Sequence, residues 1–486
     1  MHSINIKTSV VILILTVLFF VISIKGISSN HSYWSDEAFV SSVARNIILG
    51  NTNLSSGISL IGYQSMQLFS TIVSFKIFGM SEWASRFPSI LWGSIGVIFC
   101  FLLSKKLSNF WGGALSAFLY TILQVNHAYS TQAKPYSALE TITLIVFYFS
   151  VKVSQDIKNK YFHILIIFFG CLATLYNFIG LFTFIPYLVI IFPIIINRSF
   201  NRKIIPLLAM VFVFLFFWIT KIYTFLPLLF KPSHNWTIYF KELFWRQFGL
   251  FTLPAIFGIF TIKNKKILLG IIFSASTLLY AWTFVQYTHN IRYLMPIIGL
   301  LVVFFGVFWG KTGEVVFKKP ALICLIVALL IYVGGYKIIR KPAVYYTPNA
   351  DFYGDIQTAD FKVFFQKWRE KYPDFEKYPI YAGPFDSLSW YTNRYPTATF
   401  NKFTKEPTFH PEFGYTEYSR LSDFIELVNK NQQGFVMIHD WESYMPDEIK
   451  DYVKRNMKLE LRVESMAVSP NDKWPLALYS WGFDKK

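Results

Sequence analysis

The sequence has 486 residues, of which 54% are hydrophobic, 20% aromatic and only 15% charged, a composition that excludes a single soluble domain. The net charge of +18 does not indicate nucleic-acid binding, because much of the lysine and arginine lies in short clusters between apolar runs, as in the cytoplasmic loops of membrane proteins. The three cysteines all lie inside apolar runs, which excludes a disulfide framework and a cysteine-based zinc site.

The first apolar run, residues 8–24, predicts a membrane span with its N-terminus in the cytoplasm. No small-residue cleavage site follows it, so we interpret it as an uncleaved helix. Residues 25–86 are predicted to form a large first outer loop. The moderately apolar stretch 60–79 in this loop contains several polar residues, which favours a helix lying in the membrane interface.

Further apolar runs alternate with lysine- and arginine-bearing inner loops, and together they predict about eleven spans. Besides 8–24, the spans fall near 87–104, 110–126, 137–152, 161–177, 180–197, 204–222, 247–262, 267–284, 293–310 and 321–338. The sequence therefore predicts a polytopic α-helical membrane domain over residues 1–340.

From residue 341 onward the long apolar runs stop, and prolines, tyrosines and charges become frequent. Residues 361–372 and 447–457 predict helices, and residues 379–382, 434–438 and 476–481 predict short buried strands. Residues 341–486 are thus expected to form a soluble α/β domain, which the alternation of loops places outside.

Two adjacent carboxylates, Asp36 and Glu37, follow the aromatic pair Tyr33 and Trp34 just after the first span. Charged residues at a membrane boundary are commonly only solvated. Here no lysine or arginine occurs between residues 25 and 45 to pair with the acids, which favours a functional carboxylate.

Two later outer loops each place a cation beside tyrosines at the start of a span. The loop 127–136 carries Lys134 and Tyr136, and the loop 286–293 carries His289, Arg292 and Tyr293. Both cations could simply extend toward the membrane interface. Arginine, however, also suits two-point capture of a phosphate.

A carboxylate and two cations on one side of a membrane are what sugar transfer from a lipid phosphate requires. The carboxylate can take the proton of an attacking hydroxyl, and the cations can hold the phosphate and stabilise its developing charge. The run 306–312 imitates a nucleotide-binding loop, but it is one residue short between its glycines and lies at the end of a span.

Several motifs resemble those of a known group of bacterial membrane enzymes. Three motifs occur in order after the acidic pair of the first loop, namely the run 78–89 and the segments 129–136 and 292–296. Segment 129–136 is similar to a "YSQEARPY" signature, and segment 292–296 is similar to "RYLLP". In these features residues 1–340 resemble the polyprenyl-phosphate-dependent glycosyltransferases of the GT-C fold, and specifically the protein O-mannosyltransferases and the aminoarabinose transferase of lipid A.

The resemblance implies a multi-pass protein of the bacterial inner membrane with a site on the periplasmic side. Asp36 would be the catalytic carboxylate with Glu37 as its neighbour, and Lys134 and Arg292 would contact the donor phosphate beside Tyr136 and Tyr293. Trp34, Tyr63 and His289 would line a substrate pocket. Tyr63 begins the stretch where the family has "HPP", and Gln132 replaces its signature glutamate, so two metal ligands are missing and the need for a divalent ion stays open.

The resulting hypothesis is an inverting transferase that moves a sugar from a polyprenyl-phosphate carrier to a glycan, lipid or protein acceptor. The alternative is a transporter or flippase for a lipid-linked sugar. Transporters usually bury polar groups near the middle of the bilayer, whereas the ionisable residues here gather at the outer edge. A scaffold protein anchored by this many spans is disfavoured, because one span suffices for anchoring.

Overall fold

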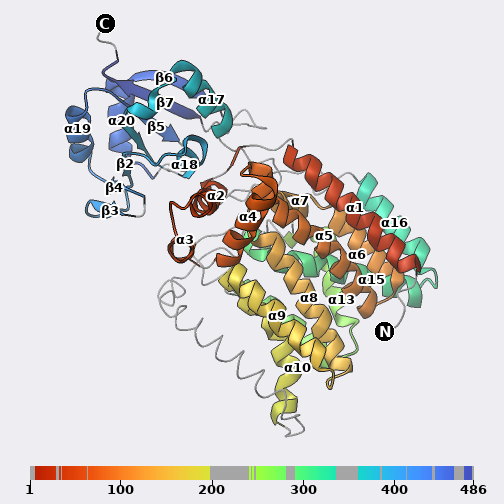
Figure 1. Ribbon diagram of the computed structural model, residues 1–486. Helices are drawn as coiled ribbons and strands as arrows, with labels where there is room; N and C mark the ends of the chain where they lie inside the picture. Colours follow the sequence, from red (N-terminus) through yellow and green to blue (C-terminus); the bar gives the residue numbers. More distant parts are fainter. Residues whose placement is uncertain are drawn as a thin grey trace. The chain divides into compact units, whose positions relative to one another are not determined.

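The computed structural model describes residues 6–28, 32–33, 35–62, 64–196, 240–241, 244–245, 248–280, 291–334, 360–383, 386–411, 413–439, 444–464 and 475–483. The chain forms two compact units, and each unit combines segments that are distant in sequence (Figure 1). The membrane unit contains Met1–Ser28, Ile58–Ser70 and Arg86–Gly354. The sheet unit contains Ser29–Gly57, Thr71–Ser85 and Asp355–Lys486.

The membrane unit is built from apolar helices at the predicted positions. They are α1 (Ile6–Ser28), α5 (Glu82–Leu107), α6 (Phe110–Ile122), α7 (Gln124–Ser130), α8 (Tyr136–Gln155), α9 (Lys160–Tyr176), η1 (Phe178–Phe184), α10 (Ile185–Ile196), α13 (Gly249–Phe260), α14 (Lys265–Tyr280), η5 (Ile291–Leu294), α15 (Met295–Val315) and α16 (Pro320–Val333). The predicted span 204–222 lies outside the described residues.

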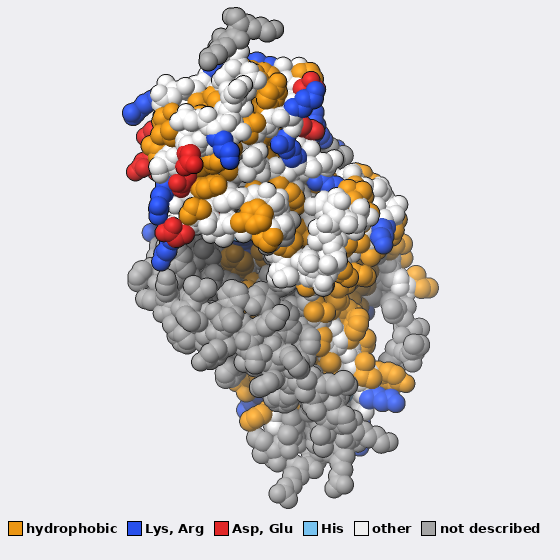
Figure 2. All heavy atoms as spheres, turned by 60° about the vertical axis from the view of Figure 1, so that its left-hand side comes forward, with side chains coloured by type: hydrophobic (Ala, Val, Ile, Leu, Met, Phe, Trp, Pro, Cys, Tyr) orange, Lys and Arg blue, Asp and Glu red, His pale blue; other side chains and the backbone are white. Residues whose placement is uncertain are grey.

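Among the described residues, four helices are long and apolar enough to cross a membrane, namely Ile6–Lys25, Glu82–Leu107, Tyr136–Gln155 and Ile291–Val315. Shorter apolar helices lie near the predicted spans 110–126, 161–177, 180–197, 247–262 and 321–338. On the face shown in Figure 2, charged side chains of both signs are scattered over the C-terminal part of the sheet unit, whereas the described helices of the membrane unit present mostly hydrophobic side chains. These features place the chain in a membrane.

The predicted interfacial helix over residues 60–79 is wrong in its boundaries. The structure has two helices there, α3 (Leu54–Ile61) and α4 (Ser65–Phe78). Gly62 adopts a φ of +62°, and its N–H donates to the carbonyl of Ile58. A left-handed glycine in this position ends a helix, which the hydropathy of the stretch does not report.

Helix α15 lies at the centre of the membrane unit and is buried along most of its length. It packs against α6, α8, α13 and α16. Small residues allow the closest of these contacts, as is common between membrane helices. A Cβ on Gly306 of α15 would lie 2.5 Å from the carbonyl oxygen of Gly112 on α6.

The sheet unit contains a seven-stranded mixed sheet with the strand order β3-β4-β2-β1-β5-β7-β6. The strands are β1 (Ile380–Ala382), β2 (Ala398–Phe400), β3 (Thr408–His410), β4 (Tyr415–Tyr418), β5 (Gly434–His439), β6 (Lys458–Val463) and β7 (Leu476–Trp481). Strands β4, β2, β1 and β5 run parallel, whereas β3, β7 and β6 pair antiparallel.

Helices cover both faces of this sheet (Figure 1). On one face α17 (Phe361–Lys371) and α18 (Asp386–Thr392) bury Trp368 and Leu388 against the strands. On the other face α19 (Leu421–Lys430) and α20 (Asp447–Asn456) bury Phe424 and Ile449. Every residue of β5 is buried, as expected for a parallel strand covered on both sides.

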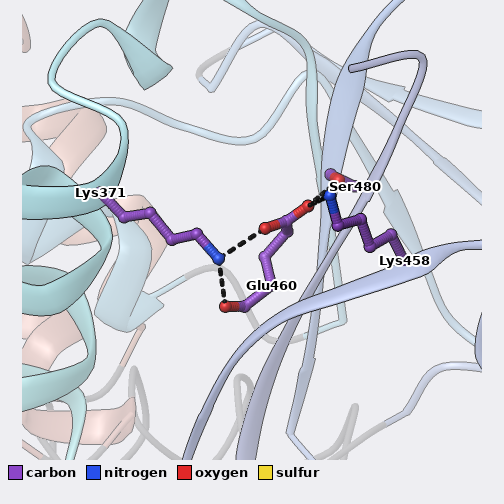
Figure 3. Close-up of polar contacts among 4 residues, drawn as sticks. All are labelled: Lys371, Lys458, Glu460 and Ser480. Carbon is purple, nitrogen blue, oxygen red and sulfur yellow. Dashed lines mark hydrogen bonds and ion pairs between the residues drawn. The ribbon is translucent and has the colours of Figure 1, made fainter. Parts of the chain in front are cut away.

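A buried carboxylate joins α17 to the edge of the sheet (Figure 3). Lys371 Nζ lies 2.6 Å from Glu460 Oε2, and Ser480 Oγ donates to Glu460 Oε1 at 2.8 Å. Lys458 Nζ adds a longer ion pair of 3.7 Å. Burial acts to raise the pKa of Glu460, but hydrogen bonds from Lys371, Ser480 and Tyr372 outweigh it, so the pKa is lowered.

Candidate active site

A cluster of one arginine and two tyrosines lies at the start of two helices of the membrane unit. Arg292 and Tyr293 belong to the turn η5 that leads into α15, and Tyr136 is the first residue of α8. The Arg292 guanidinium carbon lies 5.1 Å from the ring centroid of Tyr293 and 5.8 Å from that of Tyr136. The two tyrosine rings meet edge to face with centroids 6.1 Å apart.

This arrangement fixes the guanidinium and concentrates positive potential. Arg292 Nη2 donates to the Tyr293 hydroxyl at 3.2 Å, and cation–π contacts with two rings add to its stabilisation. Helices α8 and α15 pack together and both begin at the cluster, so their N-terminal N–H groups and helix dipoles face the same region. Such a combination favours an anion, and a phosphate in particular.

Lys134 precedes this cluster in a tightly packed segment of the membrane unit. Its side chain is buried, its N–H donates to the carbonyl of Gln132 at 2.8 Å, and its carbonyl accepts from Ser89 Oγ at 3.2 Å. The segment from His127 to Tyr136 is buried throughout, which is unusual for a surface loop. The structure therefore brings Tyr136, Arg292 and Tyr293 together, with Lys134 two residues before Tyr136.

Asp36 and Glu37 lie in the first turn of α2 (Ser35–Ile48), which belongs to the sheet unit. Asp36 is partly exposed, whereas Glu37 is buried. Acidic residues in the first turn of a helix are stabilised as carboxylates by the helix dipole. This placement leaves Asp36 as the accessible member of the pair.

The segment around Asp36 is held within the sheet unit by contacts that the sequence does not reveal. The Tyr33 N–H donates to the Tyr391 hydroxyl at 2.8 Å, and that hydroxyl donates to Glu82 Oε1. Arg45 donates to the carbonyls of Ser389 and Trp390. No motif or periodicity in the sequence links these positions, which are more than 300 residues apart.

A second residue missed by the sequence reasoning is Glu140, a buried carboxyl in α8. Its Oε2 accepts from the Tyr120 hydroxyl at 3.0 Å. Gly299 of α15 packs against it, since a Cβ there would lie 2.9 Å from Glu140 Cγ. An acidic residue inside an apolar run, four positions after Tyr136, was the signal that could have found it.

Three predicted pocket residues, Trp34, Tyr63 and His289, lie outside the described part of the chain. Among the residues that the structure describes, no group of three or more His, Cys, Asp or Glu side chains is placed to hold a metal ion.

Comparison with known proteins agrees with the motifs described above. Residues 66–223 match the family model described as dolichyl-phosphate-mannose-protein mannosyltransferase. No curated protein sequence matches the chain.

Solved structures with a similar fold include ArnT from Cupriavidus metallidurans bound to undecaprenyl phosphate, with 12% identity, a TM-score of 0.59 and coverage of 97% of each chain. The archaeal oligosaccharyltransferase AglB from Archaeoglobus fulgidus, in complex with an inhibitory peptide and a dolichol-phosphate, has 12% identity and a TM-score of 0.50, over 84% of this chain and 61% of that one. The predicted GT-C fold is thus confirmed. The comparisons support a glycosyltransferase and give no support to a transporter.

Proposed function

We propose that this membrane glycosyltransferase of the GT-C fold moves a sugar from a polyprenyl-phosphate carrier to an acceptor on the periplasmic side of a bacterial inner membrane. The acceptor is a glycan, a lipid or a protein. The observation that carries the proposal is the cluster of Arg292, Tyr136 and Tyr293 at the N-terminal ends of α8 and α15. A rigid guanidinium beside two helix N-termini in a membrane protein suits the phosphate of a lipid.

The structural neighbours support the same ligand class. The similar ArnT structure holds undecaprenyl phosphate, and the similar AglB structure holds a dolichol-phosphate. Both are long isoprenoid chains that end in a phosphate. We therefore assign Arg292 and Lys134 to the donor phosphate, with Tyr136 and Tyr293 orienting the guanidinium.

In the proposed reaction Asp36 is the general base. It takes the proton of the acceptor hydroxyl while the oxygen attacks the anomeric carbon of the sugar from the face opposite the phosphate. The bond between that carbon and the phosphate oxygen breaks, and the electron pair leaves with the polyprenyl phosphate. Arg292 and Lys134 stabilise the charge that develops on the departing phosphate, and the configuration of the sugar is inverted.

The remaining predicted residues complete the proposal. Glu37 supports the local charge beside Asp36, and Trp34, Tyr63 and His289 line the sugar and acceptor pocket. Residues 1–340 form the catalytic membrane domain, whose first periplasmic loop is 25–86, and residues 341–486 form a periplasmic domain.

Donor recognition is tested by the binding of undecaprenyl phosphate to the purified protein in detergent. Arg292→Lys keeps the positive charge but loses the planar group that the two rings hold, so we expect affinity to fall about 10- to 100-fold, as for loss of one or two charge-assisted hydrogen bonds. Lys311→Arg is the matched control, because Lys311 is a cation of the same unit that donates to the Thr261 carbonyl. Equal affinities for Arg292→Lys and the native protein would remove Arg292 from the phosphate site.

Transfer is tested by mass analysis of envelope glycolipids, glycans and glycoproteins from cells with the native gene, without it and with Asp36→Asn. We expect one sugar modification to be absent from both altered strains. The release of free polyprenyl phosphate that accompanies the transfer should be absent as well. Normal modification by well-inserted Asp36→Asn protein would exclude Asp36 as the base. Movement of the carrier across liposomes without release of polyprenyl phosphate would favour the flippase.

A further inference from the structure

The segment that carries Asp36 is fastened to the C-terminal α/β fold on both sides of the carboxylate. Before it, Ser32 Oγ accepts from the N–H of Phe361 at 3.1 Å, and the Tyr33 N–H donates to Tyr391. After it, Arg45 donates to the carbonyls of Ser389 and Trp390 at 2.7 and 2.8 Å. Asp36 and Arg45 are nine positions apart in the helix α2, which is a rigid distance of about 13 Å.

The first-loop residues satisfy main-chain groups that the helix ends of the α/β fold leave open. Phe361 is the first residue of α17, whose initial N–H groups have no partner within the helix. Ser389 and Trp390 lie in the last turn of α18, where the carbonyls are likewise open and the helix dipole favours a cation. Arg45 is therefore bound as a cap on α18, and its guanidinium also lies 5.0 Å from the Trp390 ring centroid.

These contacts are buried and well packed. Tyr33 is fully buried, and its ring centroid lies 4.8 Å from that of Trp390. Arg45 is 8% exposed. Cutting such a contact leaves a buried polar group with no compensation, which is costly. The attachment is consequently stiff rather than a loose surface association.

Helix α18, which contacts the segment on both sides of Asp36, is part of the core of the sheet unit. The ring of Tyr391 stacks on Phe365 of α17 with centroids 5.5 Å apart, and the neighbouring Leu388 is buried against the strands. A displacement of α18 would therefore be transmitted directly to Tyr33 and Arg45, the residues that flank Asp36.

We propose that the C-terminal α/β fold is the positioning frame of the catalytic base, with Tyr391 and Arg45 as the positioning residues that set the place of Asp36. The inference rests on the proposed function of Asp36 and adds a role for the C-terminal fold. Neither residue touches the substrate in this proposal. Both act by holding the backbone on either side of the carboxylate, where a shift of about 1 Å can lower the rate by up to two orders of magnitude.

The test compares Tyr391→Phe and Arg45→Lys with the native full-length protein, using sugar transfer in membranes at controlled amounts of folded protein. Tyr391→Phe keeps the stacked ring and removes only the hydroxyl that joins Tyr33 to Glu82. Arg45→Lys keeps the charge and loses the paired hydrogen bonds to the carbonyls of Ser389 and Trp390. We expect kcat to fall about tenfold or more in each variant, while binding of undecaprenyl phosphate and the shape of the kcat–pH profile stay unchanged.

The matched control is Tyr381→Phe, which removes a phenol hydroxyl from the opposite face of the same sheet. That hydroxyl donates to the Leu427 carbonyl and accepts from Asn431, and these contacts lie away from α2. A general loss of stability would lower the amount of folded protein for all three variants but not the turnover per folded molecule.

The outcomes separate the two proposals. If Asp36→Asn is inactive while Tyr391→Phe and Arg45→Lys turn over at the native rate, the positioning role is wrong and the assignment of the base stands. If Asp36→Asn is active, the assignment of the base fails first. Reduced kcat in both positioning variants, with Tyr381→Phe at the native rate, supports the frame.

Discussion

The close contact between α6 and α15 makes Gly306 a sensitive position. A Cβ at Gly306 would lie 1.9 Å from Ser116 Oγ and 2.5 Å from the Gly112 carbonyl oxygen. Ser116 could rotate away, but it would give up its hydrogen bonds to the carbonyls of Val302 and Val303. The carbonyl of Gly112 is backbone and cannot move without shifting the helix. Gly306→Ala therefore forces α6 and α15 apart.

The expected cost follows from these two clashes. Overpacking of a well-packed interior typically costs about 1–3 kcal/mol, and alanine in place of glycine returns up to about 1 kcal/mol of helix propensity. The net destabilisation is therefore up to about 2 kcal/mol, which corresponds to a fall in Tm of up to about 3 °C for a chain of this length. Because α15 directly follows the turn η5 that carries Arg292, binding of undecaprenyl phosphate should weaken as well.

Thermal unfolding of the purified protein in detergent measures this effect. Gly249→Ala is the control, since the nearest atom to its new Cβ is the Phe244 carbonyl oxygen at 4.0 Å, and we expect its Tm to be unchanged or slightly raised. A Gly306→Ala protein with the Tm of the Gly249→Ala protein would show that the two helices are not in close contact.

Two further predictions concern the acid sensitivity of the sheet unit. Because the folded-state pKa of Glu460 is lowered, its ion pair stabilises the fold above the unfolded carboxyl pKa, and this contribution of about 1 kcal/mol is lost as the pH falls through the folded value. Glu460→Gln should therefore speed hydrogen exchange in β6 at pH 7, and the acceleration should be smaller at pH 3; an acceleration of equal size at both pH values would contradict this. Burial lowers the pKa of His439 to about 3, so protonation favours the unfolded state, and stability should decline by up to about 1.4 kcal/mol per pH unit below pH 6.5. His439→Phe, which retains an aromatic ring beside Phe361, should flatten the change in Tm between pH 7 and 5, and an unaltered slope would be evidence against the histidine as its source.

Hydropathy and charge alternation predict the membrane helices well, because a span needs a fixed length of apolar sequence. Helices α5, α8 and α15 begin and end within a few residues of their predicted bounds, as do α17, α20, β5 and β7 in the α/β fold. The short strands β2, β3 and β4 and the helix α18 were not predicted. Each is short, and its position depends on neighbours in the sheet rather than on its own periodicity.

Part of the candidate site could likewise be predicted from the sequence, and part could not. The pairing of Arg292 with Tyr136 follows from two spans that begin on the same side, and the alternation of loops predicts this arrangement. The contacts of Tyr391 and Arg45 with the Asp36 segment could not be predicted. They depend on carbonyls at the end of α18 and on a hydroxyl whose two partners, Tyr33 and Glu82, come from two other segments. Hydrogen bonds to backbone leave no compositional trace in a single sequence.

The sheet unit joins residues near the beginning of the chain to residues near its end. Tyr33 and Tyr391 are separated by 358 positions, so their contact cannot form until ribosomal synthesis is nearly complete. The first loop therefore lacks these partners while the intervening helices are inserted. Contacts between residues so distant in sequence form late in folding. A truncated product that lacks the last strands would therefore keep its membrane helices and still leave the Asp36 segment without its partners.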